Sequence, residues 1–154
     1  MSERTLIILK PDTVTRGLLG KVISRFEEKG LKLVGCKMIE LNNEVLEKHY
    51  DHLKDKPFFP SIVSYMTSSP VLVQAWEGVE AVDVVRLMIG VTNSRQAQPG
   101  TVRGDFAMSI GRNIVHASED IDAAKVELER FFDQNELYSY TRADEDKIYE
   151  DDEK

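Results

Sequence analysis

The sequence is poor in cysteine and proline, and it lacks long apolar runs. Cys36 is the single cysteine of the 154 residues, so no disulfide can form within the chain. With 5 prolines and 9 glycines no linker or repeat is visible, which favours one globular domain over residues 1–154. The opening apolar run, Leu6 to Leu9, is too short for a signal-peptide core or a membrane span. We therefore expect no membrane partner and a cytoplasmic location.

Basic residues are also in the minority. The chain has 20 Lys and Arg against 27 Asp and Glu, a formal net charge of −7. Affinity for a nucleic-acid backbone needs clustered cations, so a general nucleic-acid binder is disfavoured. A locally positive pocket can still attract a small anion in an acidic protein. The acidic tail, 144–154, contains Ile148 and Tyr149, which we expect to be two apolar anchors of an extended segment.

Apolar periodicity predicts an alternation of strands and helices. The expected strands are 5–9, 31–41, 70–76 and 113–117, and the expected helices are 17–30, 44–52, 61–68, 79–89 and 121–132. Residues 77–78 are expected to be a turn, and 90–111 a long functional loop. Ser118 is expected to be the N-cap of the last helix. This order favours an α+β sandwich with a four-stranded antiparallel sheet.

One segment, 103–119, concentrates groups that bind phosphate. Gly104 and Gly111 allow the backbone to approach a ligand closely, and Arg103 and Arg112 can meet phosphate oxygens in a fork. Asn113 can donate to a sugar hydroxyl. The segment therefore predicts a site for a phosphorylated ligand.

His116 follows a short apolar run in the same segment, so its imidazole is expected to be held by a buried strand. A fixed imidazole beside a phosphate indicates phosphoryl transfer. The alternative is that His116 is an ordinary hydrogen-bonded histidine, which is the more frequent role at a strand end. The chain's other histidines, His49 and His52, lie three residues apart and could bind zinc, but no convincing third ligand accompanies them.

The string N-I-V-H-A-S, preceded by R-G-D-F, closely resembles the active-site motif of nucleoside diphosphate kinases, N-x-x-H-G-S-D. Ala117 here replaces the usual glycine, and Glu119 the usual aspartate. Further motifs match nearly from end to end: L-I-I-L-K-P-D, H-Y-x-x-L-K-D-K-P-F-F-P, V-x-V-x-A-W-E-G, T-N, P-G-T-V-R-G-D-F and I-Y-E. The resemblance implies a ferredoxin-like fold and a ping-pong transfer of the γ-phosphate through a phosphohistidine.

The resemblance also implies a role for each matching position. Those roles are Lys10 and Asn113 at the ribose and phosphate, Tyr50 near the nucleophile, His49 and Arg86 near the phosphates, Thr92 and Arg103 at the outer phosphates, Phe58 and Ile110 on the base, and Ser118 and Glu127 orienting His116. Ile110 departs mildly from the family, where valine is common. Similar proteins assemble as hexamers built from dimers, so we expect a homo-oligomer with Ile148 and Tyr149 on a neighbouring subunit. Some relatives are tetramers.

The chemistry is sound without the family. A neutral imidazole is a competent nucleophile near pH 7, and a carboxylate such as Glu127 on its far nitrogen would fix the tautomer. Because no carboxylate cluster suggests a protein-held metal, Mg²⁺ is expected to arrive with the nucleotide. Two alternatives stay open: a binding or regulatory module on the same fold, and a metal-dependent phosphoesterase, for which no ligand set can be assembled.

Overall fold

A computed structural model describes residues 2–153. Its centre is a four-stranded sheet in the order β2-β3-β1-β4, formed by β1 (Ser2–Leu9), β2 (Lys32–Ile39), β3 (Val71–Val79) and β4 (Val115–Ala117). Every neighbouring pair is antiparallel. The predicted α+β sandwich with a four-stranded antiparallel sheet is therefore confirmed.

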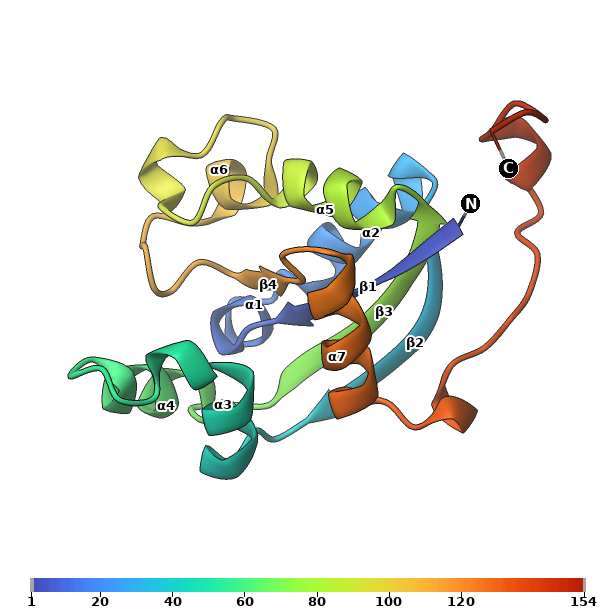
Figure 1. Ribbon diagram of the computed structural model, residues 1–154. Helices are drawn as coiled ribbons and strands as arrows, with labels where there is room; N and C mark the ends of the chain where they lie inside the picture. Colours follow the sequence, from blue (N-terminus) through green and yellow to red (C-terminus); the bar gives the residue numbers. More distant parts are fainter. Residues whose placement is uncertain (1, 154) are drawn as a thin grey trace.

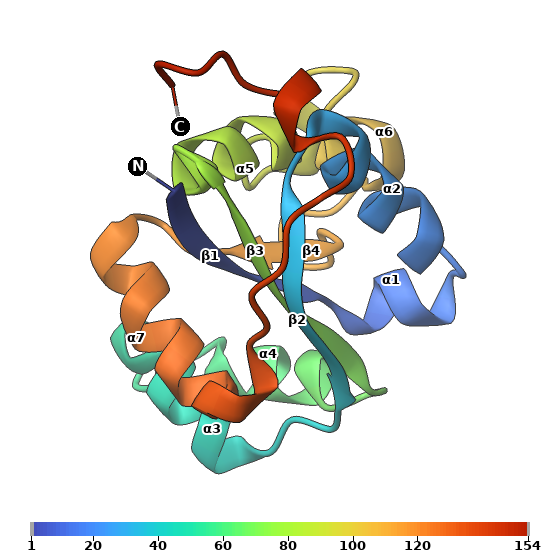
Figure 2. The same cartoon turned by 90° about the vertical axis from the view of Figure 1, so that its right-hand side faces the viewer.

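Helices cover both faces of this sheet (Figures 1 and 2). One face is covered by α2 (Leu19–Lys29), α5 (Ala81–Ile89) and α6 (Val102–Phe106). The other is covered by α3 (Asn43–His49), α4 (Phe59–Met66) and α7 (Ile121–Phe131). The short helix α1 (Pro11–Thr15) follows β1 directly, and single 3₁₀ turns lie at Asp51–Leu53, Ser94–Gln96, Gln134–Glu136 and Glu145–Lys147.

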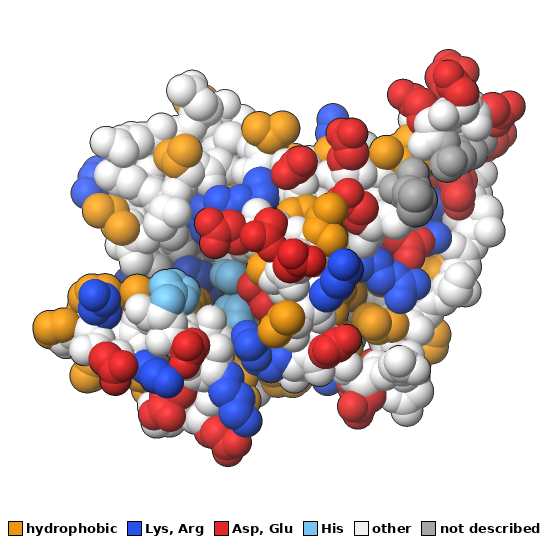
Figure 3. Space-filling model, in the orientation of Figure 1, with side chains coloured by type: hydrophobic (Ala, Val, Ile, Leu, Met, Phe, Trp, Pro, Cys, Tyr) orange, Lys and Arg blue, Asp and Glu red, His pale blue; other side chains and the backbone are white. Residues whose placement is uncertain are grey.

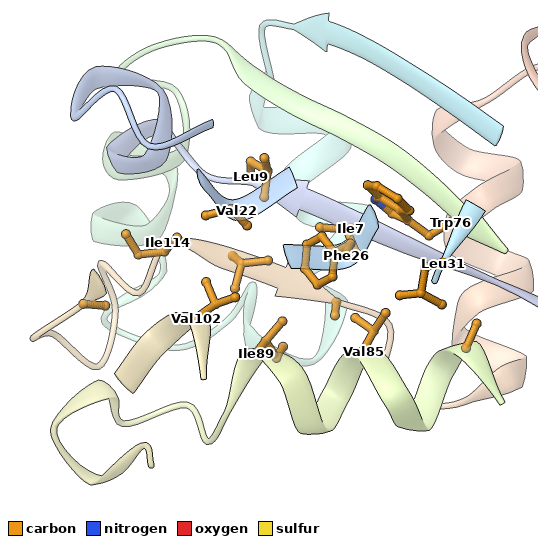
Figure 4. Close-up of a cluster of buried hydrophobic side chains, with 14 residues drawn as sticks. Ile7, Leu9, Val22, Phe26, Leu31, Trp76, Val85, Ile89, Val102 and Ile114 are labelled. Carbon is orange, nitrogen blue, oxygen red and sulfur yellow. The ribbon is translucent and has the colours of Figure 1, made fainter. Parts of the chain in front are cut away.

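The alternation of side chains along β1 supplies both cores. Ile7 and Leu9 join a cluster with Phe26 and Trp76 under α2 and α5 (Figure 4). Leu6 and Ile8 point to the opposite face, under α3, α4 and α7. All four β1 side chains are fully buried, which explains the unbroken apolar run. Odd-numbered and even-numbered residues of β1 therefore contact different helices, and a residue paired with one of them on a neighbouring strand faces the same helices.

Two local predictions are wrong. Residues 77–78 continue β3 and do not turn, because Glu77 pairs with Arg4 and Lys32 on the two neighbouring strands, each at 2.7 Å. The turn comes at Glu80, whose φ is +50°. Helix α7 is capped by Asp120, whose carboxylate accepts from the Ala123 amide at 2.8 Å, and not by Ser118.

The tail lies against its own chain. Ile148 covers Gly30, where an added Cβ would come within 2.8 Å of its methyl group. The Tyr149 hydroxyl accepts from the Val79 amide at 3.3 Å. Arg142 secures the approach to the tail by donating to the Leu31 carbonyl at 2.7 Å. Ile148 and Tyr149 thus both have contacts within their own chain, and the expectation that they also contact a neighbouring subunit stays a prediction. No helix among the described residues is long and apolar enough to cross a membrane.

Candidate functional site

The sheet register aims His116 at the helices that carry its partners. On β4, His116 lies opposite Ile8 of β1, so its side chain shares the face covered by α3 and α7. Figure 3 shows histidine side chains at a hollow of the surface with Lys and Arg side chains beside them. His49 at the end of α3 and Glu127 on α7 meet His116, and one ligand atom from each of the three lies within 4.8 Å of the others.

Glu127 fixes the tautomer of His116. The Nε2 atom of His116 lies 2.8 Å from Glu127 Oε2, which also accepts from the Ser118 hydroxyl at 3.1 Å. Because the carboxylate is the acceptor, Nε2 carries the proton and Nδ1 keeps its lone pair. Burial lowers the pKa of His116, although Glu127 opposes that shift, so the ring is neutral near pH 7. The predicted pairing of Ser118 and Glu127 with His116 is thus present, with Ser118 acting through Glu127.

The His49 ring contacts His116 from the side of α3, and Tyr50 contacts His49. The His49 ring meets the His116 ring edge-on with centroids 4.4 Å apart, and meets Tyr50 at 4.7 Å. Burial, followed by His116 and Arg130, lowers the pKa of His49 to about 2, so His49 is neutral. Burial raises the pKa of Tyr50 to about 12, with Glu127 adding to the effect, so its hydroxyl stays protonated. The site therefore places two neutral side chains beside the nucleophile candidate.

Lys10 and Asn113 form one buried unit, as expected for residues at the same ligand. Lys10 Nζ donates to Asn113 Oδ1 at 2.7 Å, and burial lowers the pKa of Lys10 to about 8, with Arg103 contributing. The Asn113 amide donates both hydrogens within the chain, to the carbonyls of Thr92 at 3.1 Å and Ile110 at 2.9 Å. Without a ligand, both N–H groups of Asn113 are thus used inside the chain, and a contact of Asn113 with a sugar hydroxyl stays a prediction. Its Oδ1 has one further lone pair with which to accept.

Arg103 is part of the framework before it meets any ligand. It is 6% exposed, and its guanidinium donates to the carbonyls of Gly90 at 2.9 Å, Asn113 at 3.3 Å and Val115 at 2.7 Å. Three of its five N–H groups are thereby used, which leaves two for a phosphate. Burial and the nearby Arg86 lower the pKa of Arg103 to about 10, so it remains charged. Arg86 itself is exposed on α5.

A cleft of about 820 Å³ opens beside this cluster. Six of the predicted residues line it: Lys10, Tyr50, Phe58, Thr92, Ile110 and Asn113. Phe58 and Ile110 are 51% and 52% exposed, which leaves both apolar faces open to a ligand. Arg112 lines this cleft and lies over the Tyr65 ring, 5.8 Å from its centroid, and its contact with phosphate oxygens stays a prediction.

The predicted ligand approach at Gly104 is also wrong. A Cβ there would lie 2.0 Å from the Gln98 carbonyl oxygen, so the missing side chain admits the chain's own backbone. Gly111 does line the cleft. The segment 90–111 is a folded insertion that contains α6 and one 3₁₀ turn.

Another residue that shapes the site, Ile114, has no signal in the sequence. Ile114 has a φ of +75°, an unfavourable conformation for a β-branched residue. Asp12 accepts from its amide at 3.2 Å, and its carbonyl accepts from the Lys10 amide at 2.8 Å and the Thr13 hydroxyl. The Tyr65 hydroxyl in turn donates to Asp12. This strained residue stands between Asn113 and His116, so the α1 segment sets the orientation of both.

The two departures from the family motif are both accommodated. Ala117 pairs with Ile7 in extended β4 and does not belong to the residues with positive φ, so glycine is not required there. Glu119 is exposed beyond the end of β4. Neither residue contacts the cluster of His116 and Glu127 through a hydrogen bond that the structure records within residues 2–153.

Comparison with known proteins assigns the chain to a family. The family model described as nucleoside diphosphate kinase matches residues 3–137. A nucleoside diphosphate kinase of Parabacteroides distasonis is 52% identical over 98% of this chain and 99% of its own length, and nucleoside diphosphate kinase A of Rattus norvegicus is 47% identical over 97% and 98%. The solved structure of a halophilic nucleoside diphosphate kinase from Halobacterium salinarum in complex with CDP has a TM-score of 0.94 and 43% identity, covering 97% of this chain and 100% of that one. The chain therefore belongs to the nucleoside diphosphate kinase family and is a phosphotransferase that acts on nucleotides.

Proposed function

We propose that this kinase works through a phosphohistidine on Nδ1 of His116. The observation that carries the proposal is the 2.8 Å contact between His116 Nε2 and Glu127, because it leaves the lone pair on the opposite nitrogen. In the first half-reaction Nδ1 attacks the γ-phosphorus of a nucleoside triphosphate. The bond from that phosphorus to the bridging oxygen breaks, and the nucleoside diphosphate leaves. In the second, a terminal oxygen of another nucleoside diphosphate attacks the same phosphorus, and Nδ1 regains its lone pair.

Cations that the fold already holds in place would stabilise the charge that develops on the phosphoryl oxygens. Lys10 has two N–H groups left after its bond to Asn113, and Arg103 has two left after its three bonds to carbonyls. Arg86 stands close enough to lower the pKa of Arg103. Because these groups are held before the ligand arrives, little reorganisation is needed during transfer. Thr92 and His49 complete the proposed phosphate end, and Phe58 and Ile110 the base end.

Mg²⁺ fits this site as a companion of the nucleotide. The ion prefers several oxygen ligands, and the phosphate end offers cations instead. Two carboxylates lie near the site, and both already have hydrogen-bond partners. Glu127 contacts His116 and Ser118, and Asp12 accepts from Tyr65 and the Ile114 amide. Phosphate oxygens would therefore hold the ion, which would neutralise charge between the β- and γ-phosphates.

Glu127→Gln should slow transfer without eliminating it. Glutamine retains an oxygen for one donor but loses the negative charge that His116 and Ser118 share. A hydrogen bond to a charged group contributes about 1.5–3 kcal/mol, so kcat should fall about tenfold to a hundredfold. The measurement is steady-state transfer from ATP to a second diphosphate. The matched control is Glu129→Gln, an exposed residue of the same helix, and equal rates in both variants would remove Glu127 from the mechanism.

Phe58→Ala should lower the kcat/KM of all acceptor nucleotides by a similar factor. Phe58 and Ile110 offer flat or aliphatic faces, and neither can read a base edge. Stacking contributes about 1–3 kcal/mol per base, so kcat/KM should fall by a similar factor for ADP, GDP, CDP and UDP as acceptors. The wild-type protein should accept all four with comparable efficiency. Preference for one base by several orders of magnitude would require a polar reader and would contradict this account.

Two further expectations rest on the sequence and its relatives. A homo-oligomer, a hexamer built from dimers, is proposed because similar proteins assemble in that way. A cytoplasmic location for a single domain of 154 residues is proposed from the single cysteine and the ordinary composition. No specific observation favours the alternative of a binding or regulatory module.

A further inference from the structure

His49, which the proposed mechanism places at the phosphate end, carries a buried polar atom whose partner that mechanism does not name. Its Nδ1 lies 3.2 Å from Nη1 of Arg130 on α7, while its Nε2 is buried and has no hydrogen-bond partner among residues 2–153. Buried donors and acceptors are nearly always paired in proteins, and an unpaired one is costly. A cost of this kind at the edge of a reaction site indicates a partner that arrives with the ligand.

The chemistry of Arg130 decides what His49 offers to that partner. A guanidinium has donors and no acceptor, so the 3.2 Å contact exists only when Nδ1 of His49 presents its lone pair. In a neutral imidazole the proton then resides on Nε2. The unpaired atom is therefore an N–H donor, held in a ring whose centroid is 4.4 Å from that of His116. This tautomer also argues against zinc on His49 Nε2, because a ligating nitrogen must be unprotonated and Arg130 cannot accept the displaced proton.

We propose that Arg130 is a positioning residue that locks His49 as an Nε2–H donor for an oxygen of the phosphoryl group on His116. Arg130 touches neither the nucleotide cleft nor His116, and it acts through His49. The donor is neutral and fixed before the phosphate arrives, so it needs no reorganisation as charge develops. The part of the proposal that concerns the phosphoryl oxygen rests on the proposed function. The part that concerns the tautomer does not.

The first test is the tautomer of His49 in the ligand-free protein. Histidine labelled with ¹⁵N gives long-range proton–nitrogen spectra with only three imidazoles to assign. Wild type should show His49 protonated on Nε2 and unprotonated on Nδ1. Arg130→Leu should show a mixture of tautomers, and Arg130→Lys, which retains a donor, should restore the wild-type pattern. A His49 protonated on Nδ1 in the wild type, or a pattern unchanged in Arg130→Leu, would overturn the proposal.

The second test is kinetic. Arg130→Leu should lower kcat by about threefold to tenfold, less than the loss of a direct donor, while KM is unchanged. The matched control is Lys125→Leu, which removes a cation from an exposed position of the same helix.

A third test follows the His49 Nε2 signal during the reaction. Adding ATP should shift this signal in the wild type as the phosphoryl oxygen accepts a hydrogen bond from it. If a phosphohistidine forms and this signal does not move, the proposal fails while the proposed function stands. If no phosphohistidine forms, the proposed function fails, and the tautomer result remains a separate finding.

Discussion

Replacing His116 with alanine is expected to abolish phosphoryl transfer and to leave the fold intact. Removal of a catalytic nucleophile typically costs about five or six orders of magnitude, because the remaining groups hold a substrate that has nothing to attack it. His116 does not line the cleft, so nucleotide binding should persist. The unfolding free energy should fall by about 1–3 kcal/mol, since Glu127 loses one donor and keeps Ser118.

Three measurements separate these effects: a coupled assay of transfer, titration calorimetry with ADP, and thermal unfolding. The matched control is Ala117→Gly, the adjacent residue changed to the type that the family motif carries. It should remain active, because position 117 is extended and tolerates either residue. Turnover above background in His116→Ala would contradict the nucleophile assignment.

Lys10→Met is expected to give the second-largest loss, about a hundredfold to a thousandfold in kcat/KM. The substitution removes a fixed cation from the phosphate end and leaves Asn113 Oδ1 without its donor. It should not lower thermal stability at pH 7. Burial depresses the pKa of Lys10 from 10.5 to about 8, so holding the charge inside the fold costs about 3 kcal/mol that methionine does not incur. Activity and stability should therefore change independently.

The same pKa predicts a pH dependence. Below pH 8 Lys10 is charged, and above it the folded protein loses that charge before the unfolded chain does. The kcat/KM of the wild type should therefore fall as pH rises through about 8, because this quantity reports the free enzyme. Folding stability should rise between about pH 8 and 10.5, where the unfolded state binds more protons. A kcat/KM profile that shows the same limb in Lys10→Met would assign the titration to another group.

The sequence predicts the identities of the reacting residues better than their hydrogen bonds. His116 and Lys10 could be placed because each follows a short apolar run, and the antiparallel pairing of β4 with the end of β1 brings the two residues together. The hydrogen-bond partners of Asn113 and Arg103 could not be predicted in the same way. Their N–H groups pair with carbonyls of residues 90, 92, 110, 113 and 115, and only the folded insertion brings those carbonyls within reach.

The sequence offers two possible N-cap residues for α7, Ser118 and Asp120. Asp120 is the cap, because the Ser118 hydroxyl is buried and bonded to the Leu6 amide and to Glu127. The strain at Ile114 had no signal at all, since nothing in a β-branched residue indicates positive φ. In the tail, Ile148 is an apolar anchor on Gly30, whereas Tyr149 is held within the chain through its hydroxyl, and contact of either residue with a neighbouring subunit stays a prediction.

The most direct test of the central claim is to identify the phosphorylated atom. The protein is incubated with ATP labelled at the γ-phosphate, separated from nucleotide, and treated with acid and with base. We predict an acid-labile, base-stable phosphate on the wild type and none on His116→Ala, with transfer of the label to added GDP. A ³¹P spectrum should place the phosphate on Nδ1, opposite the nitrogen that contacts Glu127. Label on any other residue, on Nε2 of His116, or retained in the His116→Ala protein would contradict the account.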